Sequence, residues 1–431
     1  MIWNPGAETL EHGRRGDLQR ARLLETIAWA GARVPFYRDR LAKARVTQLE
    51  DVGTLPFTHK TDLREYYPFG FFAVPLADVV RIHASSGTKG KPTVVGYTRD
   101  DLDVWAEVMA RAMVAAGCRP GDVLHNAFGY GLFTGGLGFH QGAERIGMTV
   151  VPASSAQTAR QQLLVTDFRP AGLCATPSFA LHIAEAMRGS GSAPDACGLR
   201  YGMFGAEPWT EGIRRALEAA FGCPAFDIYG LSEIIGPGVA GECEIRDGLH
   251  VADDHFLPEI VDPTSGDPVA PGAEGELVLT TLTKRAAPVI RYRTGDLTAL
   301  VPGPCRCGRT SIRIGRIKGR ADDMLIVRGV NLYPSEVEST LLGFPDLAPH
   351  YQLVVDRRDA FARLEVEVEP TEALVARAGG FTPEATPLSS LRGQVAAGLK
   401  AALGLTIQVT LVPPRTIARS EGKAVRVIER R

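Results

Sequence analysis

Cysteine is sparse in this chain, with 7 residues among 431, and the seven do not form the framework of a small disulfide-bonded protein. A reducing compartment would leave them as buried thiols or as metal ligands. No apolar run approaches the roughly 18 to 20 residues that a membrane-spanning helix needs. The segment from Met1 to Glu8 lacks a basic stretch followed by an apolar one, so we expect no secretion signal and a cytoplasmic enzyme.

Net charge is almost absent as well. The 48 Lys and Arg and 49 Asp and Glu residues give a formal charge of −1, which predicts neither a nucleic acid nor a membrane as a partner. Internal repeats and low-complexity tracts are also missing. The 431 residues, 45% of them hydrophobic, suffice for two or more cores.

Strand-like apolar runs alternate with helical patterns through most of the chain. Residues 149–152 and 276–281 have the composition of strands, and a helical pattern from Val104 to Ala115 is closed by Gly117. This layout predicts an α/β fold with mixed β-sheets and helices in a large N-terminal domain, residues 1–321.

The pattern changes after that point, which predicts a small α+β domain over residues 322–431. Its expected helices lie near residues 334–342 and 388–403, and its expected strands at 351–356, 363–369 and 407–412.

Residues 85–93 read Ser-Ser-Gly-Thr-Lys-Gly-Lys-Pro-Thr and form the one phosphate-loop-like stretch. It is not a Walker loop, because Lys91 is followed by proline rather than by Ser or Thr. The flanking residues 79–84 and 93–98 look like two strands, so the loop would join a hairpin and present backbone amides and hydroxyls to a phosphate chain. The alternative is a flexible Gly/Ser/Lys turn.

Further motifs follow in a fixed order along nearly the whole chain. They are residues 34–41, 55–64, 128–140, 204–209, 229–233, 291–296, 319–323 and the segment around Lys423. With these motifs, the chain resembles the phenylacetate-coenzyme A ligase family of the adenylate-forming, or acyl-CoA synthetase, superfamily. The resemblance implies ATP-dependent activation of a carboxylic acid, and it is less specific for the acid.

The resemblance also implies roles at the phosphates. The loop residues expected to cradle the β- and γ-phosphates are Ser85, Ser86, Gly87, Thr88 and Gly90. Ser232 would contact a phosphate, Glu233 would hold Mg²⁺, and Lys423 would act at the α-phosphate. The family loop commonly has a second threonine where this chain has Lys89, so a charge here either replaces a hydroxyl contact or points to solvent.

A second set of implied roles concerns the nucleoside. Tyr229 would pack on the adenine ring, and the neighbouring nucleotide-binding residues would be Ala206, Glu207 and Gly230. Asp296 would accept hydrogen bonds from the ribose hydroxyls, and Arg320 would assist near the ribose or phosphate. A lone Asp or Tyr is more often structural; the order of the motifs favours the functional reading.

Four residues suggest a zinc site. Cys243 and His250 flank the expected turn at Arg246-Asp-Gly, and Cys305 and Cys307 lie in a Gly/Pro-rich loop. Three thiolates and one imidazole would fill a tetrahedral structural site, with His255 as the competing fourth ligand and buried unligated cysteines as the alternative. The family resemblance favours zinc, without a catalytic role.

An aromatic, glycine-containing set of side chains predicts a flat slot for an aryl acid. Its members are Phe128, Tyr130, Gly131, Phe139, Ile234, Gly236 and Pro237, and the alternative for each aromatic is core packing. Phenylacetate is the leading acid, followed by benzoate, anthranilate and hydroxylated forms.

The predicted reaction forms an acyl-adenylate and pyrophosphate, after which the small domain turns about a hinge near Asp322 and coenzyme A accepts the acyl group. The second hypothesis is an adenylating enzyme that passes the acid to a carrier protein or an amine. A non-catalytic nucleotide-binding protein is the third, and the presence of Lys423, Glu233 and Asp296 argues against it. A homodimer is left open.

Overall fold

The computed structural model describes residues 1–85, 91–155, 157–327, 330–356 and 363–430. It divides into two compact units. The first unit consists of residues 1–175, 196–206 and 223–317, and the second of residues 176–195, 207–222 and 318–431. The predicted domain boundary between residues 321 and 322 stays a prediction.

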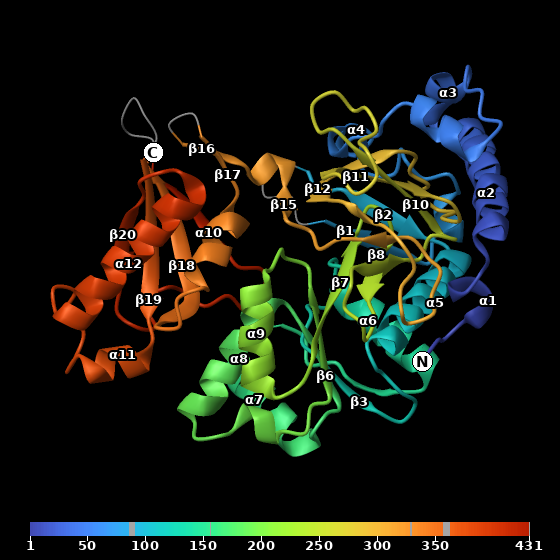
Figure 1. Ribbon diagram of the computed structural model, residues 1–431. Coiled ribbons are helices and arrows are strands. Elements are labelled where there is room, and N and C mark those ends of the chain that lie inside the picture. Colours follow the sequence, from blue (N-terminus) through green and yellow to red (C-terminus); the bar gives the residue numbers. More distant parts are fainter. Residues whose placement is uncertain (86–90, 156, 328–329, 357–362, 431) are drawn as a thin grey trace. The chain divides into compact units, whose positions relative to one another are not determined.

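A mixed sheet forms the centre of the first unit (Figure 1). Its order within the described residues is β13-β14-β9-β8-β7-β6-β5-β3-β4. The strands from β4 to β7 pair in parallel, and those from β7 to β13 pair antiparallel. The bounds are β3 Val123–Asn126, β4 Thr149–Val151, β5 Gly172–Ala175, β6 Tyr201–Gly205, β7 Ala225–Leu231, β8 Gly236–Glu242, β9 Leu249–Val251, β13 Leu300–Val301 and β14 Arg313–Ile314.

Two smaller antiparallel arrangements belong to the same unit. Strands β10 Phe256–Val261, β11 Gly275–Thr281 and β12 Tyr292–Thr298 pair in that order. Strands β1 Arg81–Ala84 and β2 Val94–Tyr97 form a hairpin in which Ala84 pairs with Val94. The two strands predicted around the phosphate loop are therefore confirmed, as are the strands predicted at residues 149–152 and 276–281.

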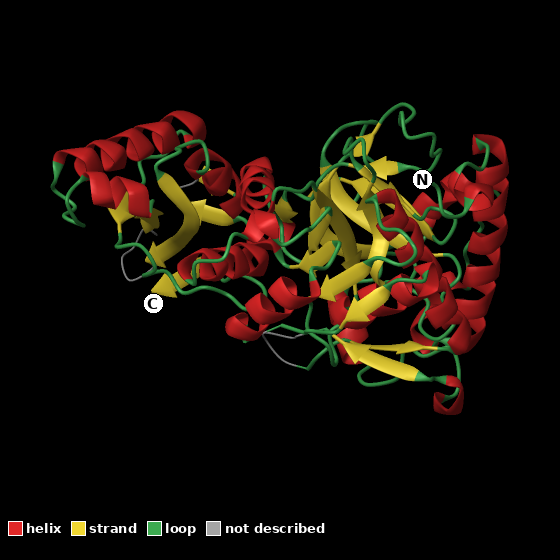
Figure 2. Cartoon of the chain, turned by 90° about the horizontal axis from the view of Figure 1, so that it is seen from below, coloured by secondary structure: helices red, strands yellow, loops and turns green. Residues whose placement is uncertain are grey.

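Helices cover the sheets of this unit (Figures 1 and 2). Their bounds are α1 Pro5–Glu8, α2 His12–Arg33, α3 Pro35–Leu41, α4 Lys60–Glu65, α5 Arg99–Ala115, α6 Gly135–Ile146 and α7 Thr158–Phe168, with short 3-10 turns at Leu49–Thr54 and Leu76–Asp78. Helices α5 and α6 pack on each other and on β8. The start of α5 is capped, because Thr98 Oγ1 accepts a 3.1 Å hydrogen bond from Asp101 N and the Asp101 carboxylate accepts one from Thr98 N.

The second unit has its own sheet and its own core. Within the described residues the sheet order is β20-β19-β18-β21, with β18 and β19 antiparallel and the outer pairs parallel. Its apolar core contains Leu353, Val366, Val395 and Leu399. The bounds of its strands are β15 Gly319–Arg320, β16 Leu325–Val327, β17 Val330–Leu332, β18 Leu347–Asp356, β19 Arg363–Pro370, β20 Gln408–Leu411 and β21 Val427–Arg430.

The helices of the second unit come from three parts of the chain. They are α8 Pro177–Gly189, α9 Glu211–Phe221, α10 Pro334–Leu341, α11 Glu372–Arg377 and α12 Thr386–Leu403, with 3-10 turns at Pro194–Ala196, which ends one residue past this unit, and at Ala321–Asp323. Helix α12 packs on α10 and on β20, and α8 packs on α9. The five elements predicted for residues 322–431 are confirmed. The sequence prediction omitted α11, the pair β16 and β17, and β21.

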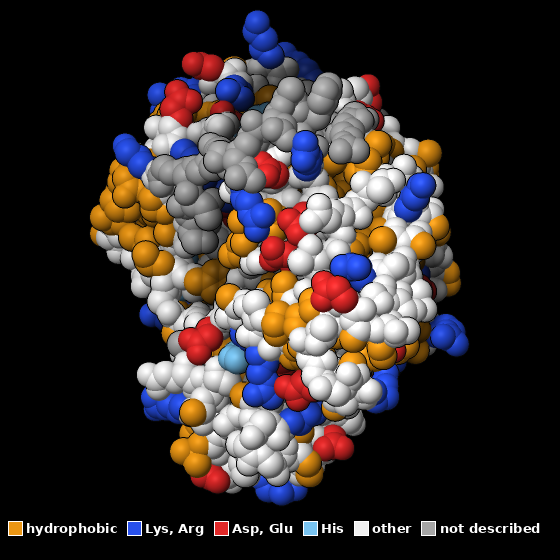
Figure 3. All heavy atoms as spheres, turned by 90° about the vertical axis from the view of Figure 1, so that its left-hand side faces the viewer, with side chains coloured by type: hydrophobic (Ala, Val, Ile, Leu, Met, Phe, Trp, Pro, Cys, Tyr) orange, Lys and Arg blue, Asp and Glu red, His pale blue; other side chains and the backbone are white. Residues whose placement is uncertain are grey.

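No helix in the described part of the chain is both long and apolar enough to cross a membrane. On the face shown in Figure 3, acidic and basic side chains are interspersed with apolar ones. That mixture agrees with the near balance of 48 cationic and 49 anionic residues.

Candidate functional site

Tyr229 and Asp296, predicted to bind adenine and ribose, meet in the first unit. Tyr229 lies on β7 and Asp296 on β12, and the tyrosine hydroxyl donates a 2.6 Å hydrogen bond to Asp296 Oδ2. A second hydrogen bond joins Asp296 N to Thr294 Oγ1 at 3.0 Å. A hydrogen bond to a carboxylate fixes its orientation, so the Asp296 side chain is held in place.

The short segment between β7 and β8 carries Ser232 and Glu233, which are both buried. Three buried donors bind alternate carbonyl groups, two in this segment and the third at the start of β8. Lys284 Nζ donates to Glu233 O at 3.2 Å, Tyr97 Oη to Ile235 O at 2.9 Å, and Trp105 Nε1 to Pro237 O at 2.9 Å. These three hydrogen bonds go to backbone carbonyl groups. They therefore fix the segment without engaging the side-chain carboxylate of Glu233.

Thr134 and Gly230 make further contacts at this segment. Ser232 Oγ lies 3.2 Å from Thr134 Oγ1, and either atom can donate. Gly230 pairs with Pro237 across β7 and β8, and a Cβ on Gly230 would lie 1.9 Å from Gly236 O. Only glycine fits that approach, so Gly230 is required for the close packing of the two strands.

The Glu233 carboxylate fits a hard cation. Its side chain is 5% exposed, and its Oε1 is buried and accepts no hydrogen bond from the described residues. The Lys60 ammonium lies 3.3 Å from this oxygen. A carboxylate oxygen is the kind of ligand that Mg²⁺ prefers, so the side chain fits this ion.

Lys284 is the buried cation behind Glu233. Burial lowers its pKa to about 8, although the carboxylates of Asp101 and Glu233 oppose that shift. Its ammonium also lies 5.0 Å from the centroid of the Tyr97 ring.

Most of the predicted phosphate loop, Ser86, Gly87, Thr88, Lys89 and Gly90, lies outside the described residues. Ser85 is described: its backbone N donates to Thr93 O at 2.9 Å. The Ser85 hydroxyl is buried and has no hydrogen-bond partner among the described residues. An unsatisfied buried hydroxyl is costly, so it is a candidate contact for a bound ligand.

The predicted acyl-binding residues divide into core and polar members. Phe128 and Phe139 stack with ring centroids 5.1 Å apart and both are buried in the main core, as is Ile234. The Tyr130 hydroxyl accepts a 2.9 Å hydrogen bond from Asn126 Nδ2 and lies 3.1 Å from His140 Nδ1. Their assignment to an aryl slot stays a prediction.

Three glycine and proline positions complete that set. Gly131 has φ +123°, and a Cβ there would have no neighbour within 4 Å. A Cβ on Gly236 would lie 2.4 Å from the Trp105 ring, and Pro237 follows it on β8. Gly236 therefore lies against the indole.

The Lys423 segment is anchored within the second unit. Thr176 Oγ1 donates to Gly422 O at 2.7 Å, and Ala424 N donates to Glu207 Oε2 at 2.8 Å. Ser420 Oγ donates to Lys423 O at 2.7 Å. The backbone on both sides of Lys423 is therefore fixed by hydrogen bonds.

Arg419 adds an ionic anchor four residues before Lys423. Its guanidinium donates to both oxygens of Glu369, at 2.9 and 2.8 Å, and to Glu185 Oε2 at 2.9 Å. Glu185 on α8 also pairs with His350. Burial would raise the pKa of Glu185, but His350 and Arg419 lower it to about 2.

The structure also describes the surroundings of the other predicted nucleotide-binding residues and of the predicted hinge. Glu207 accepts a 2.7 Å hydrogen bond from Ser178 N, and Ala206 before it has φ +69°. Arg320 Nε donates to Asp322 Oδ1 at 2.8 Å. Burial and Asp322 raise the pKa of Asp323, while Arg320 and Lys423 oppose that rise.

Cys243, His250, Cys305 and Cys307 form a cluster in the first unit, with all ligand atoms within 4.8 Å of one another. Cys243 Sγ is 3.8 Å from Cys305 Sγ, and Cys307 Sγ is 3.4 Å from His250 Nε2. Thiolates about 2.3 Å and an imidazole about 2.0 Å from a tetrahedral zinc would be separated by about 3.8 and 3.5 Å. The donor set and its spacing therefore fit zinc.

The surroundings of the cluster orient its ligands. His250 Nδ1 lies 3.0 Å from Ser311 Oγ, and Arg309 N donates to Cys307 Sγ at 3.5 Å. Burial raises the pKa of Cys243 to about 12, and burial, reinforced by Arg309 and Arg313, lowers that of His250 to about 3.

The competing ligand, His255, is bound elsewhere. Its Nδ1 lies 2.8 Å from Thr283 Oγ1 and its Nε2 lies 3.2 Å from Asp254. Within the described residues the cluster thus uses His250 rather than His255.

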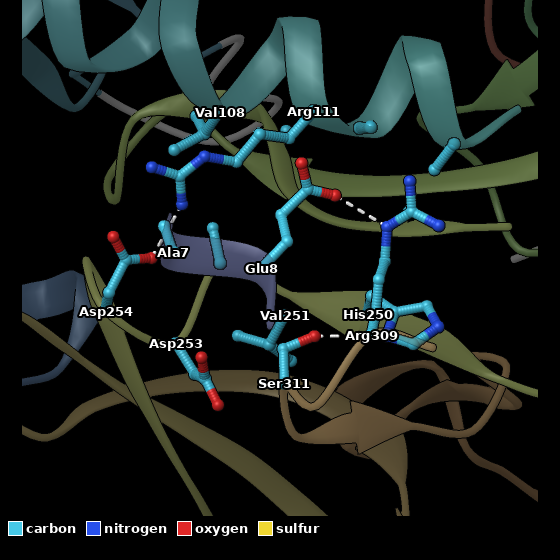
Figure 4. A pocket seen from close by; sticks show the side chains of 15 residues that line it. Ala7, Glu8, Val108, Arg111, His250, Val251, Asp253, Asp254, Arg309 and Ser311 are labelled. Atoms are coloured by element: carbon cyan, nitrogen blue, oxygen red, sulfur yellow. Dashed lines mark hydrogen bonds and ion pairs between the residues drawn. The ribbon is translucent and has the colours of Figure 1, made fainter. Parts of the chain in front are cut away.

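A cavity of about 30 Å³ lies beside the cluster (Figure 4). Charged side chains face one another across it: Arg111 pairs with Asp254 at 2.8 Å and Arg309 with Glu8 at 2.6 Å. Burial raises the pKa of Asp253, which also lines the cavity, to about 6, with Arg15 opposing. A space of this volume suits an ordered water and is too small for an organic acid.

Known families match both parts of the chain. The AMP-binding enzyme family matches residues 39–282, and the AMP-binding enzyme C-terminal domain matches residues 329–431. The chain belongs to the AMP-binding enzyme family. The predicted fold class, with a large N-terminal and a smaller C-terminal domain, is thereby confirmed.

Similar proteins confirm the predicted resemblance to the phenylacetate-coenzyme A ligase family. A phenylacetate-coenzyme A ligase of Thermus thermophilus is 52% identical over 99% of this chain and 98% of its own length. A phenylacetate-coenzyme A ligase of Escherichia coli is 50% identical over 100% and 99%. A crystal structure of 2-hydroxyisobutyryl-CoA ligase has a TM-score of 0.93 at 32% identity, with 100% of this chain and 92% of that chain covered.

The sequence prediction missed several residues that position the site. Lys60 lies inside the quoted motif at residues 55–64, but its contact with Glu233 depends on tertiary structure. Thr134 likewise lies inside the quoted motif at residues 128–140, whereas Lys284 gave no local signal. Thr176 precedes a proline and caps α8, so its position as a helix start could have been found from sequence.

Proposed function

We propose that the chain activates an aryl carboxylic acid with ATP and transfers the acyl group to coenzyme A. The substrate carboxylate attacks the α-phosphorus and pyrophosphate leaves; the thiol sulfur then attacks the acyl carbon and AMP leaves. The observation that carries the proposal is the oriented Tyr229–Asp296 pair, in the same unit as the anchored Ser232–Glu233 segment. The relatives at 52% and 50% identity support the acid–CoA ligase activity.

The nucleotide-binding roles follow the predicted assignments. Asp296 would accept hydrogen bonds from the ribose hydroxyls, and Tyr229 would pack against adenine while its hydroxyl keeps the carboxylate oriented. Ser232 would contact a phosphate, and Ser85 would supply a hydroxyl at the loop. Arg320 would assist at the ribose or phosphate.

Glu233 and Lys423 would stabilise the negative charge of the reacting phosphates. A magnesium ion bound with ATP would offset the charge of the leaving pyrophosphate, and Glu233 would be its protein ligand. The Lys423 ammonium would stabilise the carboxylate and α-phosphate oxygens as negative charge develops. The hydrogen bonds to Gly422 and Ala424 would hold that lysine's backbone in place.

Phenylacetate is the leading acid. The two relatives named as phenylacetate-coenzyme A ligases support it. Benzoate and anthranilate are the other candidates. Pyrophosphate release should be much faster with aryl acids than with octanoate, and equal rates for phenylacetate and octanoate would contradict the aryl slot.

The acceptor is tested by the second half-reaction. The protein is incubated with ATP and each aryl acid, with coenzyme A, carrier protein or hydroxylamine as acceptor. Thioester formation with coenzyme A is the expected result. Acid-dependent pyrophosphate release with transfer only to the carrier protein would instead support the alternative biosynthetic function.

The domain motion is part of the proposal. Residues 322–431 would turn about a hinge near Asp322 between adenylate formation and thioester formation. Asp322 is exposed and lies in the middle of the short 3-10 turn Ala321–Asp323, so a change of backbone dihedrals there would disturb little packing.

The cysteine cluster is proposed as a structural zinc site. The support is the 3.8 Å and 3.4 Å ligand separations, together with the contact from Ser311 to His250. Protein atoms would fill all four positions, which leaves none for a substrate. A cytoplasmic location remains a sequence prediction, and a homodimer remains open.

A further inference from the structure

Lys60 and Glu233 form an ion pair between segments far apart in sequence. The ammonium lies 3.3 Å from Glu233 Oε1, with the lysine side chain 39% exposed and the glutamate side chain 5% exposed. Lys60 is the first residue of α4. Two residues before it, Thr58 is tied to the edge of β12: Thr58 N donates to Arg291 O and Arg293 N donates to Thr58 O, both at 3.0 Å.

The two partners differ in freedom to move. The backbone of Glu233 is bound by the buried Lys284, and its neighbours Ile235 and Pro237 are bound by Tyr97 and Trp105. Lys60 instead has a flexible four-carbon stem that reaches solvent. The carboxylate is therefore the fixed partner and the ammonium is the movable one.

Glu233 has a strong requirement for a cation. Its Oε1 is buried and accepts no hydrogen bond from the described residues, and the Lys60 ammonium lies 3.3 Å from that atom. The buried Lys284 binds the Glu233 carbonyl oxygen instead, so Lys60 is the ion-pair partner of Oε1. An uncompensated buried carboxylate is strongly unfavourable. A magnesium ion at Glu233 would take the same oxygen, and the ion and the ammonium would repel each other.

We propose that Lys60 is the resident cation of Glu233 in the nucleotide-free protein and that it is displaced when a divalent ion binds. This inference rests on the proposed function, in which Glu233 holds magnesium. Lys60 is thus a positioning residue: it neutralises Glu233 at rest and opposes entry of a divalent ion without nucleotide. Once released, its three N–H donors are free to bind anionic phosphate oxygens.

The test measures Mn²⁺ binding to the nucleotide-free protein by electron paramagnetic resonance. Lys60→Met removes the competing charge while keeping the apolar stem, so the ion should bind roughly 3- to 10-fold more tightly than to the parent. Lys60→Arg keeps the charge and should bind like the parent. Adding Glu233→Gln to Lys60→Met should abolish the gain.

A matched control replaces the exposed Lys43 with methionine, which changes net charge by the same amount. Its Mn²⁺ affinity should equal that of the parent. Equal affinities for the parent and Lys60→Met, with unchanged melting curves, would overturn the inference. An equal gain in Lys43→Met would overturn it as well, because the effect would then reflect net charge.

A second readout separates this inference from the proposed function. The Mg²⁺ concentration that gives half-maximal pyrophosphate release with phenylacetate should fall in Lys60→Met, while the maximal rate also falls. If no acid supports pyrophosphate release but the Mn²⁺ gain is present, the proposed function fails and the ion-pair inference holds. If release is normal in the parent but Lys60→Met shows neither shift, the ion-pair inference alone fails.

Discussion

The hydroxyl of Tyr229 donates a 2.6 Å hydrogen bond to the carboxylate of Asp296, which belongs to a different sheet. Tyr229 belongs to β7 of the mixed sheet and Asp296 to β12 of the smaller one. The phenol thus fixes the carboxylate that we assign to the ribose. The pair shows how two motifs distant in the sequence come into contact within the first unit.

Replacing Tyr229 with phenylalanine should weaken ATP binding. The ring remains for adenine, but Asp296 loses a hydrogen bond to its charged carboxylate, a contact typically worth about 1.5 to 3 kcal/mol. We expect the KM for ATP to rise by roughly 10-fold or more, while the KM for the acid changes little. Tyr66→Phe, which keeps the ring contacts with Phe36 and Phe71, is the control and should leave both values unchanged. An unaltered KM for ATP in Tyr229→Phe would refute the orienting role.

Lys423→Ala should nearly abolish pyrophosphate release. Loss of one well-placed electrostatic contact typically costs on the order of a hundred- to a thousandfold in rate, roughly 3 to 4 kcal/mol. Supplied with chemically made acyl-adenylate and coenzyme A, the variant should still form thioester at close to the parent rate. Equal losses in both half-reactions would rule out the proposed turn of residues 322–431 between the two steps. No loss in either half-reaction would mean that Lys423 has no catalytic role.

Thr176→Val should slow adenylate formation through the position of Lys423. The substitution removes the hydroxyl that donates to Gly422 O at 2.7 Å and caps α8 by accepting from Phe179 N at 3.3 Å. Loss of the cap costs about 1 kcal/mol of stability. We expect pyrophosphate release to fall roughly 5- to 10-fold, in line with one neutral hydrogen bond, with thioester formation from supplied adenylate unchanged. Thr176→Ser retains the hydroxyl and should release pyrophosphate at close to the parent rate. If Thr176→Ser is as slow as Thr176→Val, the loss of rate does not come from the missing hydroxyl.

Metal analysis of protein purified without chelator should find about one zinc per chain. Cys305→Ser should lose the metal and lower the melting temperature, because the site is absent from the unfolded chain and binding therefore stabilises the fold. Cys197→Ser alters a buried cysteine outside the cluster and should keep its zinc. Absence of zinc from the parent, or full zinc retention in Cys305→Ser, would exclude the site.

Lys284 should make stability depend on pH in the alkaline range. Its native pKa of about 8 lies below the ordinary 10.5, so between these values the unfolded chain binds more protons than the native one. Stability from this group therefore rises as pH increases from about 8 to about 10.5, by about 3 kcal/mol at most. Urea unfolding of the parent and Lys284→Met should show a difference in free energy that changes over this window. The Lys43→Met difference should stay constant, and a constant Lys284→Met difference would disprove the shift.

The sequence by itself determined the local elements and the chemistry available. The helical spacing up to Ala115 predicted α5, and the paired apolar runs around residues 85–93 predicted the hairpin of β1 and β2. The cysteine and histidine positions around the turn at Gly248 predicted the cluster that the fold assembles. These signals are local, since periodicity, capping and turn residues act within a few positions of the chain.

Tertiary structure alone decided which distant side chains meet. Nothing near Lys60 in the sequence indicates Glu233, and nothing near Thr176 indicates Gly422, because these contacts depend on strand order and packing. Strand β21 was missed for a related reason. It is an exposed edge strand without apolar alternation, so its composition does not predict a strand. Its extended conformation comes from pairing with β18. Local propensity thus set the elements, whereas the positions of the charged and hydrogen-bonding partners required the folded chain.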